Sequence, residues 1–290
     1  MKRTKVALVY DFDETLSVHY MQDYMLIPEL GYKPEEFWHA ANEWSAKNGV
    51  DQITGSMFYF KYEYEKKGIK LTKAKLKQYG EPIEFYNGVE DWFTRINKYG
   101  RFLDLDIEHY IISSGYEEII EGCKIRKFFK DVYGCAFVFG EDGTPVWPAR
   151  VINYSGKVQY LSKINKGLGK YDDKVVNEYM PDENRRIPFK RMIYFGDGQT
   201  DIPSMKMVKN HGGNAIAVYQ PHSRKKEKAV TMLREHRVDF ALAADYREDK
   251  DIDCVVKTLL NRIATERDLE ELKKKEDKKK IKKGLLKKRD

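Results

Sequence analysis

The sequence predicts an α/β protein with a three-layer, Rossmann-like parallel sheet core and an inserted helical cap domain. Short apolar runs rich in strand-forming residues alternate with segments of helical character, which is typical of a layered sheet. After the first of these runs, residues 17–85 carry helical signals and no strand signal. Helices in a row directly after the first strand indicate a subdomain inserted into the core.

The first strand is expected at residues 6–10, a continuous apolar run that ends abruptly at Asp11. A run of this length without polar alternation suits a strand that is buried on both faces of a parallel sheet. Residues 140–152 contain Gly143 and two prolines, which predicts a hairpin or an irregular loop. The later strands are expected at residues 109–112, 136–139, 192–195, 214–219 and 239–242.

Helix boundaries follow from capping residues, glycines and prolines. In the inserted segment, one helix should span residues 20–27 and end before Pro28, and the next should begin at Pro34 and end at Gly49. Two more should begin after the capping residues Asp51 and Thr72 and end near Gly68 and Gly80. Outside that segment, helices are expected at residues 89–100, 116–124, 156–166 and in part of 170–188.

These signals divide the chain into a core of residues 1–16 and 86–265, a cap of residues 17–85 and a lysine-rich tail of residues 266–290. The tail holds 12 Lys and Arg against 7 Asp and Glu, so it carries +5 of the formal net charge of +7. A solvated helix that frays is the expected form of the tail. Binding of nucleic acid is not expected, because no aromatic residues accompany the lysines.

The composition is that of a globular protein, with 41% hydrophobic and 13% aromatic residues. No apolar run approaches the ~20 residues that span a bilayer. The basic residues 1–5 precede a short apolar run that ends in Asp11, which is a poor secretion signal. Cys123, Cys135 and Cys254 are scattered, as expected of reduced thiols. A cytoplasmic protein without a membrane partner is therefore expected.

Two carboxylates, Asp11 and Asp13, stand at the end of the first strand. Open parallel sheets place their chemistry just beyond the carboxyl ends of their strands. Two acids this close repel each other, and a divalent cation relieves that repulsion. A metal-assisted site is therefore expected at this edge. The other polar groups that should converge there are, in chain order, Ser113, Lys157, Asp197 and Asp201.

This order of groups resembles the haloacid dehalogenase superfamily of phosphotransferases. Residues 11–15, Asp-Phe-Asp-Glu-Thr, look like its first motif, and residues 196–201, Gly-Asp-Gly-Gln-Thr-Asp, look like its fourth. These two motifs are specific in combination. The resemblance covers residues 5–245, so it includes the predicted core and the cap.

The second and third motifs each have more than one candidate residue. Ser113, at the end of Ile-Ile-Ser, looks like the second motif, and Ser114 stands beside it. Lys157 looks like the third motif, and Lys163 and Lys166 follow on the same predicted helix. The resemblance favours Ser113 and Lys157 without excluding their neighbours.

The resemblance implies a role for each position. Asp11 would be the nucleophile that forms an aspartyl-phosphate. Asp13 would protonate the leaving oxygen and then take a proton from the hydrolytic water. Ser113 would hydrogen-bond a phosphoryl oxygen, and Lys157 would offset the negative charge of Asp11 and the phosphoryl group.

Mg²⁺ is the cofactor that the resemblance implies. The side chains of Asp11 and Asp197 and the backbone carbonyl of Asp13 would be its protein ligands. Asp201 completes the acidic set and would orient a water molecule bound to the metal.

An acid at the position of Asp13 marks the phosphatases and phosphomutases of this superfamily. The implied function is therefore Mg²⁺-dependent hydrolysis of a small phosphorylated metabolite. Residues 17–85 stand where the superfamily places its first-type cap, and this layout is most similar to the phosphoserine-phosphatase-like branch. That branch has a glutamate for the substrate ammonium where this chain has Tyr20, so phosphoserine itself is not the expected substrate.

Two other classes of function stay open. A glycosyltransferase can hold a metal on an Asp-x-Asp pair, but that reading leaves Asp197 and Asp201 without a task. A binding protein on a decayed phosphatase scaffold would be expected to have lost Asp11 or Asp13, and both are present. The oligomeric state stays open as well.

Overall fold

The computed structural model describes residues 3–282. Its centre is a seven-stranded sheet in the order β4-β3-β2-β1-β5-β6-β7, in which neighbouring strands are parallel except for β3 with β4. The predicted α/β class with a Rossmann-like sheet is confirmed. The strands span Thr4–Tyr10 (β1), Leu105–Tyr116 (β2), Phe129–Phe139 (β3), Pro145–Arg150 (β4), Met192–Gly196 (β5), Asn214–Tyr219 (β6) and Phe240–Ala243 (β7).

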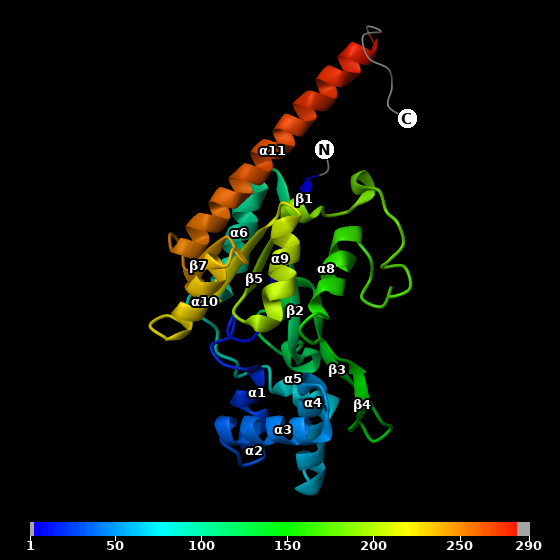
Figure 1. Ribbon diagram of the computed structural model, residues 1–290, viewed down its shortest axis with the longest axis vertical. Coiled ribbons are helices and arrows are strands. Elements are labelled where there is room, and N and C mark those ends of the chain that lie inside the picture. The colour runs from blue at the N-terminus through cyan, green and yellow to red at the C-terminus, as the bar shows by residue number, and fades with distance from the viewer. Residues whose placement is uncertain (1–2, 283–290) are drawn as a thin grey trace.

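Helices cover both faces of this sheet (Figure 1). On one face α8 and α9 pack together, and on the other α6 packs against β2 and α11. The α-helices span Met21–Tyr24 (α1), Leu26–Glu29 (α2), Pro34–Asn48 (α3), Gln52–Lys66 (α4), Lys73–Gln78 (α5), Val89–Phe102 (α6), Glu117–Ile120 (α7), Lys157–Lys166 (α8), Ile202–Asn210 (α9), Lys225–Arg234 (α10) and Asp251–Lys282 (α11).

The β1 strand lies in the middle of the sheet, and its residues from Val6 onward are completely buried. Tyr10, its last residue, stacks on Phe195 of β5 with ring centroids 4.7 Å apart. The Tyr10 hydroxyl accepts a hydrogen bond of 2.9 Å from the Trp92 indole of α6. Large aromatic contacts on both sides therefore fix the position at which β1 ends and the acidic segment begins.

The helices α1 to α5 lie together at one end of the sheet, on the side opposite the far end of α11 (Figure 1). The segments on either side of these helices, around Leu16 and Tyr86, lie side by side. Ser17 and Phe85 form an antiparallel bridge, and the Tyr86 N–H donates to the Leu16 carbonyl at 3.0 Å. Both connections of the inserted segment thus leave the core at one point.

The inserted helices follow their predicted boundaries except at the first. Asp51 caps α4 by accepting from two backbone N–H groups, and Thr72 caps α5 in the same way with one. The predicted helix at residues 20–27 is wrong, because a break at Met25 divides it into α1 and α2. Pro28 lies inside α2, so the helix does not end before this proline as predicted. A proline is tolerated there, since the first turn of a helix needs no N–H donor.

Three predictions in the core need correction. The β2 and β3 strands are longer than predicted, and Asp106, Glu108 and Lys130 in their added parts form ion pairs. The predicted helix at 116–124 shortens to α7, and Gly122 beyond its end packs so closely on α5 that a Cβ there would lie 1.7 Å from the Lys77 carbonyl oxygen. Residues 170–188 contain no α-helix but a single 3₁₀ turn, Asp182–Asn184. The hairpin among residues 140–152 is confirmed as the turn from β3 to β4.

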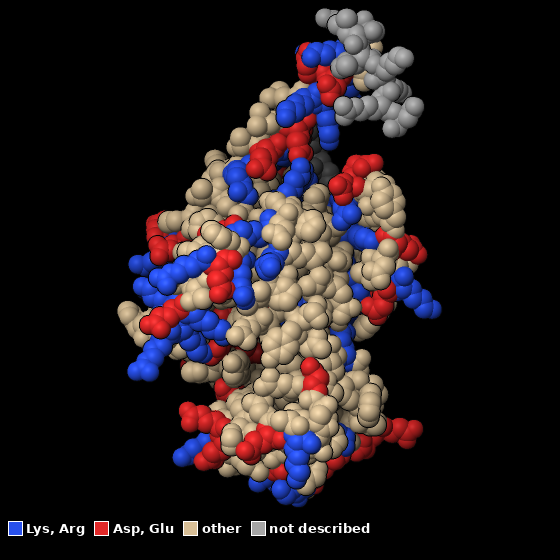
Figure 2. All heavy atoms as spheres, in the orientation of Figure 1, with Lys and Arg blue, Asp and Glu red and all other residues tan. Residues whose placement is uncertain are grey.

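The helix α11 runs without interruption across residues 265 and 266 and extends beyond the sheet (Figure 1). Its far part carries acids and lysines together on the visible face (Figure 2). The predicted fraying end at residues 283–290 lies outside the described residues. Across residues 3–282, no helix combines the length and the apolar character that crossing a bilayer requires.

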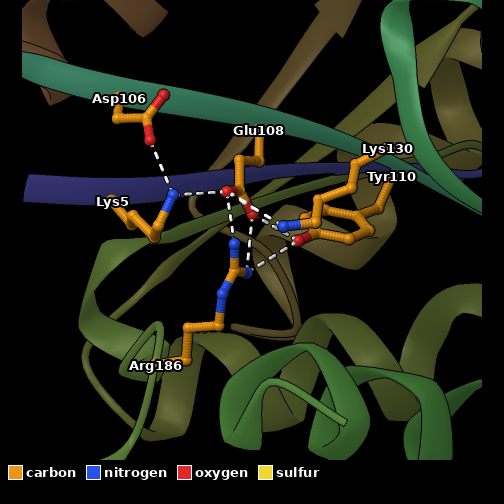
Figure 3. Close-up of polar contacts among 6 residues, drawn as sticks. All are labelled: Lys5, Asp106, Glu108, Tyr110, Lys130 and Arg186. Carbon is orange, nitrogen blue, oxygen red and sulfur yellow. Dashed lines mark hydrogen bonds and ion pairs between the residues drawn. The ribbon is translucent and has the colours of Figure 1, made fainter. Parts of the chain in front are cut away.

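A buried carboxylate, Glu108, holds together the ends of the strands that lie away from the acidic segment (Figure 3). Arg186 donates to both of its oxygens, and Lys5 donates at 2.6 Å. Burial alone would raise the pKa of Glu108, but these hydrogen bonds, with one from Tyr110, outweigh burial and lower its pKa to about 2. Because this folded-state pKa is below the ordinary value, the stabilisation is present above pH 4.5 and is lost as the pH falls toward 2.

Replacing Arg186 by methionine is expected to lower the free energy of unfolding at pH 7 by about 1–3 kcal/mol, because Glu108 loses a bidentate partner. The difference from the native chain should shrink between pH 4.5 and 2, as Glu108 becomes protonated. Urea unfolding at pH 7, 4.5 and 3 measures both effects. Arg237→Met is the control, since Arg237 forms an exposed ion pair with Glu235. A loss that is independent of pH would contradict this account.

Candidate functional site

The acidic segment begins where β1 ends. The Asp11 N–H continues the sheet by donating to the Phe195 carbonyl of β5 at 2.8 Å, and Asp11 is buried. The N–H groups of Thr15, Leu16 and Ser17 all donate to the Phe12 carbonyl, which turns the chain sharply. This turn presents the side chains of Asp11 and Asp13 at the carboxyl edge of the sheet, as the sequence predicts.

The strand β5 brings the second pair of acids to the same edge. Asp197 follows β5 directly, and Asp201 ends the 3₁₀ turn Gln199–Asp201. A Cβ on Gly196 would lie 2.4 Å from the Asp201 Cγ, so only glycine permits this approach. Carboxylate oxygens of Asp11, Asp197 and Asp201 lie within 4.8 Å of one another. The structure therefore assembles three of the four predicted acids into one cluster, and the Asp13 side chain is not part of it.

Lys157 is the only lysine of α8 that enters this cluster. Its Nζ lies 2.9 Å from Asp11 Oδ1 and 2.7 Å from Asp201 Oδ1, and the side chain is completely buried. Lys163 instead pairs with Asp173, and Lys166 donates to backbone carbonyls. Burial alone would lower the pKa of Lys157, but the two carboxylates outweigh burial and raise it. Lys157 is therefore charged.

Three protein groups donate hydrogen bonds to Asp201, which leaves its carboxylate room for one more donor. Besides Lys157, its Oδ1 accepts from the Tyr194 hydroxyl at 2.7 Å, and its Oδ2 accepts from the Gly198 N–H at 3.2 Å. The sequence reasoning missed Tyr194. A tyrosine in an otherwise apolar strand was its only signal, because a buried hydroxyl needs a partner. Asp201 is thus held as a support for Lys157 and the turn.

The three carboxylates exceed the single positive charge beside them. Burial, and then the charge of Asp201, raises the pKa of Asp11 to about 7, although Lys157 acts in the opposite direction. Burial, and then the charges of Asp201 and Asp11, raises the pKa of Asp197 well above its ordinary value. A cluster with surplus negative charge and oxygen donors only is the donor set that a hard divalent cation prefers. The residues present therefore fit a metal ion.

Asp13 lies beside this cluster and is held by the first inserted helix. Its Oδ1 accepts from the Met21 N–H of α1 at 2.7 Å, and a Cβ on Gly115 would lie 2.8 Å from its Oδ2. Burial, and then the charge of Asp11, raises the pKa of Asp13 well above its ordinary value. Asp13 therefore favours its protonated form, which can donate a proton.

The serine pair lies at the end of β2. Ser113 and Ser114 both line the same cavity as Asp11. The Ser113 Oγ is completely buried and accepts from the Gly115 N–H at 2.9 Å. The Ser114 Oγ is buried as well and has no hydrogen-bond partner within residues 3–282. Either hydroxyl can still donate to a bound group.

A cavity of about 780 Å³ opens above the acidic cluster, between the sheet edge and the inserted helices. Asp11, Asp13 and Asp197 lie among its lining residues. At its mouth Lys225 of α10 pairs with Glu14, whose φ of +57° is uncommon outside glycine. Lysines and arginines gather over the α10 side of the core (Figure 2). Neither Glu14 nor Lys225 was predicted as a site residue.

Comparison with known proteins supports the same fold. No family model matches the chain. It is 29% identical over 266 residues to an uncharacterised protein of Borreliella burgdorferi, which covers 82% of this chain and 90% of that protein. This relative therefore indicates no activity for the chain.

Solved structures match the chain at low sequence identity. A phosphoserine phosphatase in its apo form matches with a TM-score of 0.54 and 17% identity, over 88% of this chain and 98% of that one. A probable phosphoserine phosphatase from Vibrio cholerae matches at 0.56 and 14%, over 91% and 67%. A HAD-family hydrolase from Salmonella enterica serovar Typhi matches at 0.54 and 17%, over 81% and 66%. The chain thus has the haloacid dehalogenase fold in its phosphoserine-phosphatase-like form.

Proposed function

We propose that the protein is a Mg²⁺-dependent phosphatase that hydrolyses a small phosphomonoester through an aspartyl-phosphate. One observation carries the proposal: Asp11 is bound by a buried lysine, lies in a cluster of three carboxylates, and faces a cavity that also contains Asp13, whose pKa is raised by burial and by the charge of Asp11. The proposed nucleophile Asp11, the supporting cation Lys157 and the proposed proton donor Asp13 therefore lie at one site. The likeness in fold to phosphoserine phosphatases supports the same class of reaction.

Each acid has a separate task in the proposed reaction. An Asp11 carboxylate oxygen attacks phosphorus, and the bond from phosphorus to the leaving oxygen breaks. Asp13 gives its proton to that oxygen, and the alcohol leaves. Asp13 then takes a proton from water as the water attacks phosphorus, which releases inorganic phosphate and restores Asp11. The raised pKa of Asp13 supports the first proton transfer.

Mg²⁺ would be held by the side chains of Asp11 and Asp197 and the backbone carbonyl of Asp13, and it would neutralise charge on the phosphoryl oxygens. Asp201 keeps Lys157 in place and would orient a water molecule on the metal. Lys157 would offset the charge of Asp11 and the phosphoryl group. Ser113 would donate to a phosphoryl oxygen, and Ser114 is the alternative donor.

Residues 17–85 would act as a cap over a core formed by residues 1–16 and 86–265. The shared connection at Ser17 and Phe85 supports this division, because both ends of the cap leave the core together. A lid over the cavity would exclude water and select the leaving group. A cytoplasmic location is part of the proposal, and three cysteines without a disulfide support it.

A glycosyltransferase is the alternative that the Asp-x-Asp pair allows. It gives no task to Asp197, Asp201 or the buried Lys157, whereas phosphoryl transfer uses all three. A binding protein without catalysis gives no reason to keep the Lys157 ion pairs buried, since such pairs are costly to form. Turnover of a sugar nucleotide, with no phosphate release from any ester, would favour the first alternative.

Removal of metal is expected to abolish phosphate release from a panel of phosphomonoesters. EDTA should stop the native chain, and added Mg²⁺ should restore it, because Asp11 and Asp197 hold the ion. Mg²⁺ at about 100 times its dissociation constant should stabilise the native fold by about 2.7 kcal/mol. Thermal unfolding with and without Mg²⁺ measures this shift.

Asp197→Asn is the matched variant for this experiment. It should lose the Mg²⁺ shift while its melting temperature in EDTA is equal to or above that of the native chain, because one of three mutually repelling acids is gone. Phosphate release that continues undiminished in EDTA would overturn the metal assignment.

A further inference from the structure

The cap forms one wall of the cavity above Asp11, and this wall differs in charge from the core side, where acids and lysines occur together. Ten of its lining residues belong to the cap, and none of these ten is a lysine or an arginine. Two of them, Asp23 and Glu35, are acids. The lysines that line the cavity, Lys225 and Lys228, belong to α10 and are exposed at the rim. A leaving group that points toward the cap therefore meets negative charge.

Asp23 lies next to the proton donor. The Met21 N–H at the start of α1 donates to Asp13, and Asp23 follows two residues later in the same four-residue helix. Its Oδ1 accepts from the Trp38 indole of α3 at 3.0 Å, which fixes the carboxylate. Within residues 3–282 no lysine or arginine forms an ion pair with Asp23. The carboxylate is half-buried and held in place, and its basic neighbour His19 forms no ion pair with it.

Aromatic rings accompany this carboxylate. Tyr20 and Trp38 both line the cavity and pack edge to face, with ring centroids 5.9 Å apart. A π-face attracts an organic cation, and an ammonium group gains most where aromatic rings and a carboxylate occur together. Asp23, Trp38 and Tyr20 supply both elements on one wall.

We propose that the phosphomonoester is an amino-alcohol phosphate, whose leaving group carries an ammonium group and no anionic group. The inference rests on the proposed phosphatase function. The ammonium group pairs with Asp23 and contacts the rings of Trp38 and Tyr20. A carboxylate or a second phosphate in that place would face Asp23 and Glu35 without a cation to meet it. An uncharged polyol would leave the desolvated charge of Asp23 uncompensated.

Two esters that differ in one group test the inference. Phosphoethanolamine carries an ammonium group where 2-hydroxyethyl phosphate carries a hydroxyl. The native chain with Mg²⁺ is expected to favour phosphoethanolamine in kcat/KM by about tenfold or more, as a charge-assisted contact predicts. Asp23→Asn should bring the ratio of the two esters close to one. Glu43→Gln removes an exposed charge of α3 that does not line the cavity, and it should leave the ratio unchanged.

Binding separates this inference from the proposed function. The variant Asp11→Asn, with Mg²⁺, is titrated with the same two esters by calorimetry, and phosphoethanolamine should bind about tenfold more tightly. O-phosphoserine should bind more weakly than phosphoethanolamine, since its carboxylate meets the acidic wall. Equal binding of the two matched esters, or tighter binding of O-phosphoserine, would overturn the inference. If the native chain releases phosphate from no ester of the wider panel, the phosphatase proposal fails, and the binding ratio still decides what the cap wall recognises.

Discussion

Replacing Asp11 by asparagine is expected to lower the rate of phosphate release by about 10⁴-fold or more, because an amide cannot attack phosphorus. The fold should survive. Asparagine has nearly the same volume as aspartate. The substitution also removes a carboxyl group whose pKa is raised to about 7 by burial and by the charge of Asp201. The variant should therefore be at least as stable as the native chain above pH 7 in EDTA. Phosphate release and thermal unfolding measure the two effects.

The covalent intermediate gives an independent readout of the same substitution. The ester is radiolabelled on its phosphoryl group, and the native chain is quenched with acid during turnover. The native protein should then carry label, and Asp11→Asn should carry none. Asp182→Asn is the matched control, since Asp182 is exposed and pairs only with Arg185. Label on Asp11→Asn, or full activity in that variant, would assign the attacking atom to another residue.

Replacing Lys157 by methionine is expected to have the largest effect on stability. Its Nζ lies between Asp11 and Asp201, and none of the three groups is exposed. Removing the cation leaves two buried carboxylates facing each other, which typically costs about 3–5 kcal/mol. Phosphate release should be lost as well, because the negative charges of Asp11 and the phosphoryl group then repel each other. Urea unfolding and a phosphate assay measure both losses.

A second lysine and a double substitution test the cause of this effect. Lys166→Met should cost about 1 kcal/mol and keep the activity, because Lys166 donates only to carbonyls of a surface segment. Adding Asp201→Asn to Lys157→Met should recover part of the lost stability, since one of the uncompensated charges is gone. It should not recover activity. Loss of activity in Lys166→Met with retention in Lys157→Met would reverse the assignment.

The sequence predicted the elements whose signals are local. Asp51 and Thr72 begin helices because a short polar side chain accepts from the next turn wherever it stands. The end of β1 could be predicted because five buried residues precede a carboxylate. These features do not depend on what the rest of the chain does.

The features that were missed depend on distant partners. The extension of β2 back to Leu105 includes Glu108, whose burial requires Arg186 from a segment without regular structure. The segment after α7 packs tightly on α5, since Gly122 lies against the Lys77 carbonyl. No local pattern in residues 116–124 contains that contact.

The site was predictable to the same extent. The order of Asp11, Asp13 and Asp197 along strand ends indicated which groups would meet, because parallel strands bring their carboxyl ends to one edge. Which lysine of α8 reaches Asp11 depends on the rotation of that helix, so Lys157, Lys163 and Lys166 stayed candidates. Asp23 gave no signal, because its place in the cavity wall depends on the packing of α1 against Trp38 of α3.

The hydrogen bond between Leu16 and Tyr86 has a consequence for how such a protein changes over time. The two residues are held together by the core, so the polypeptide between them starts and ends at one spot. Lengthening or reshaping that polypeptide adds little closure entropy, since each doubling of a loop costs only about 0.6 kcal/mol. Changes in the length of that polypeptide can therefore accumulate at little cost in folding free energy.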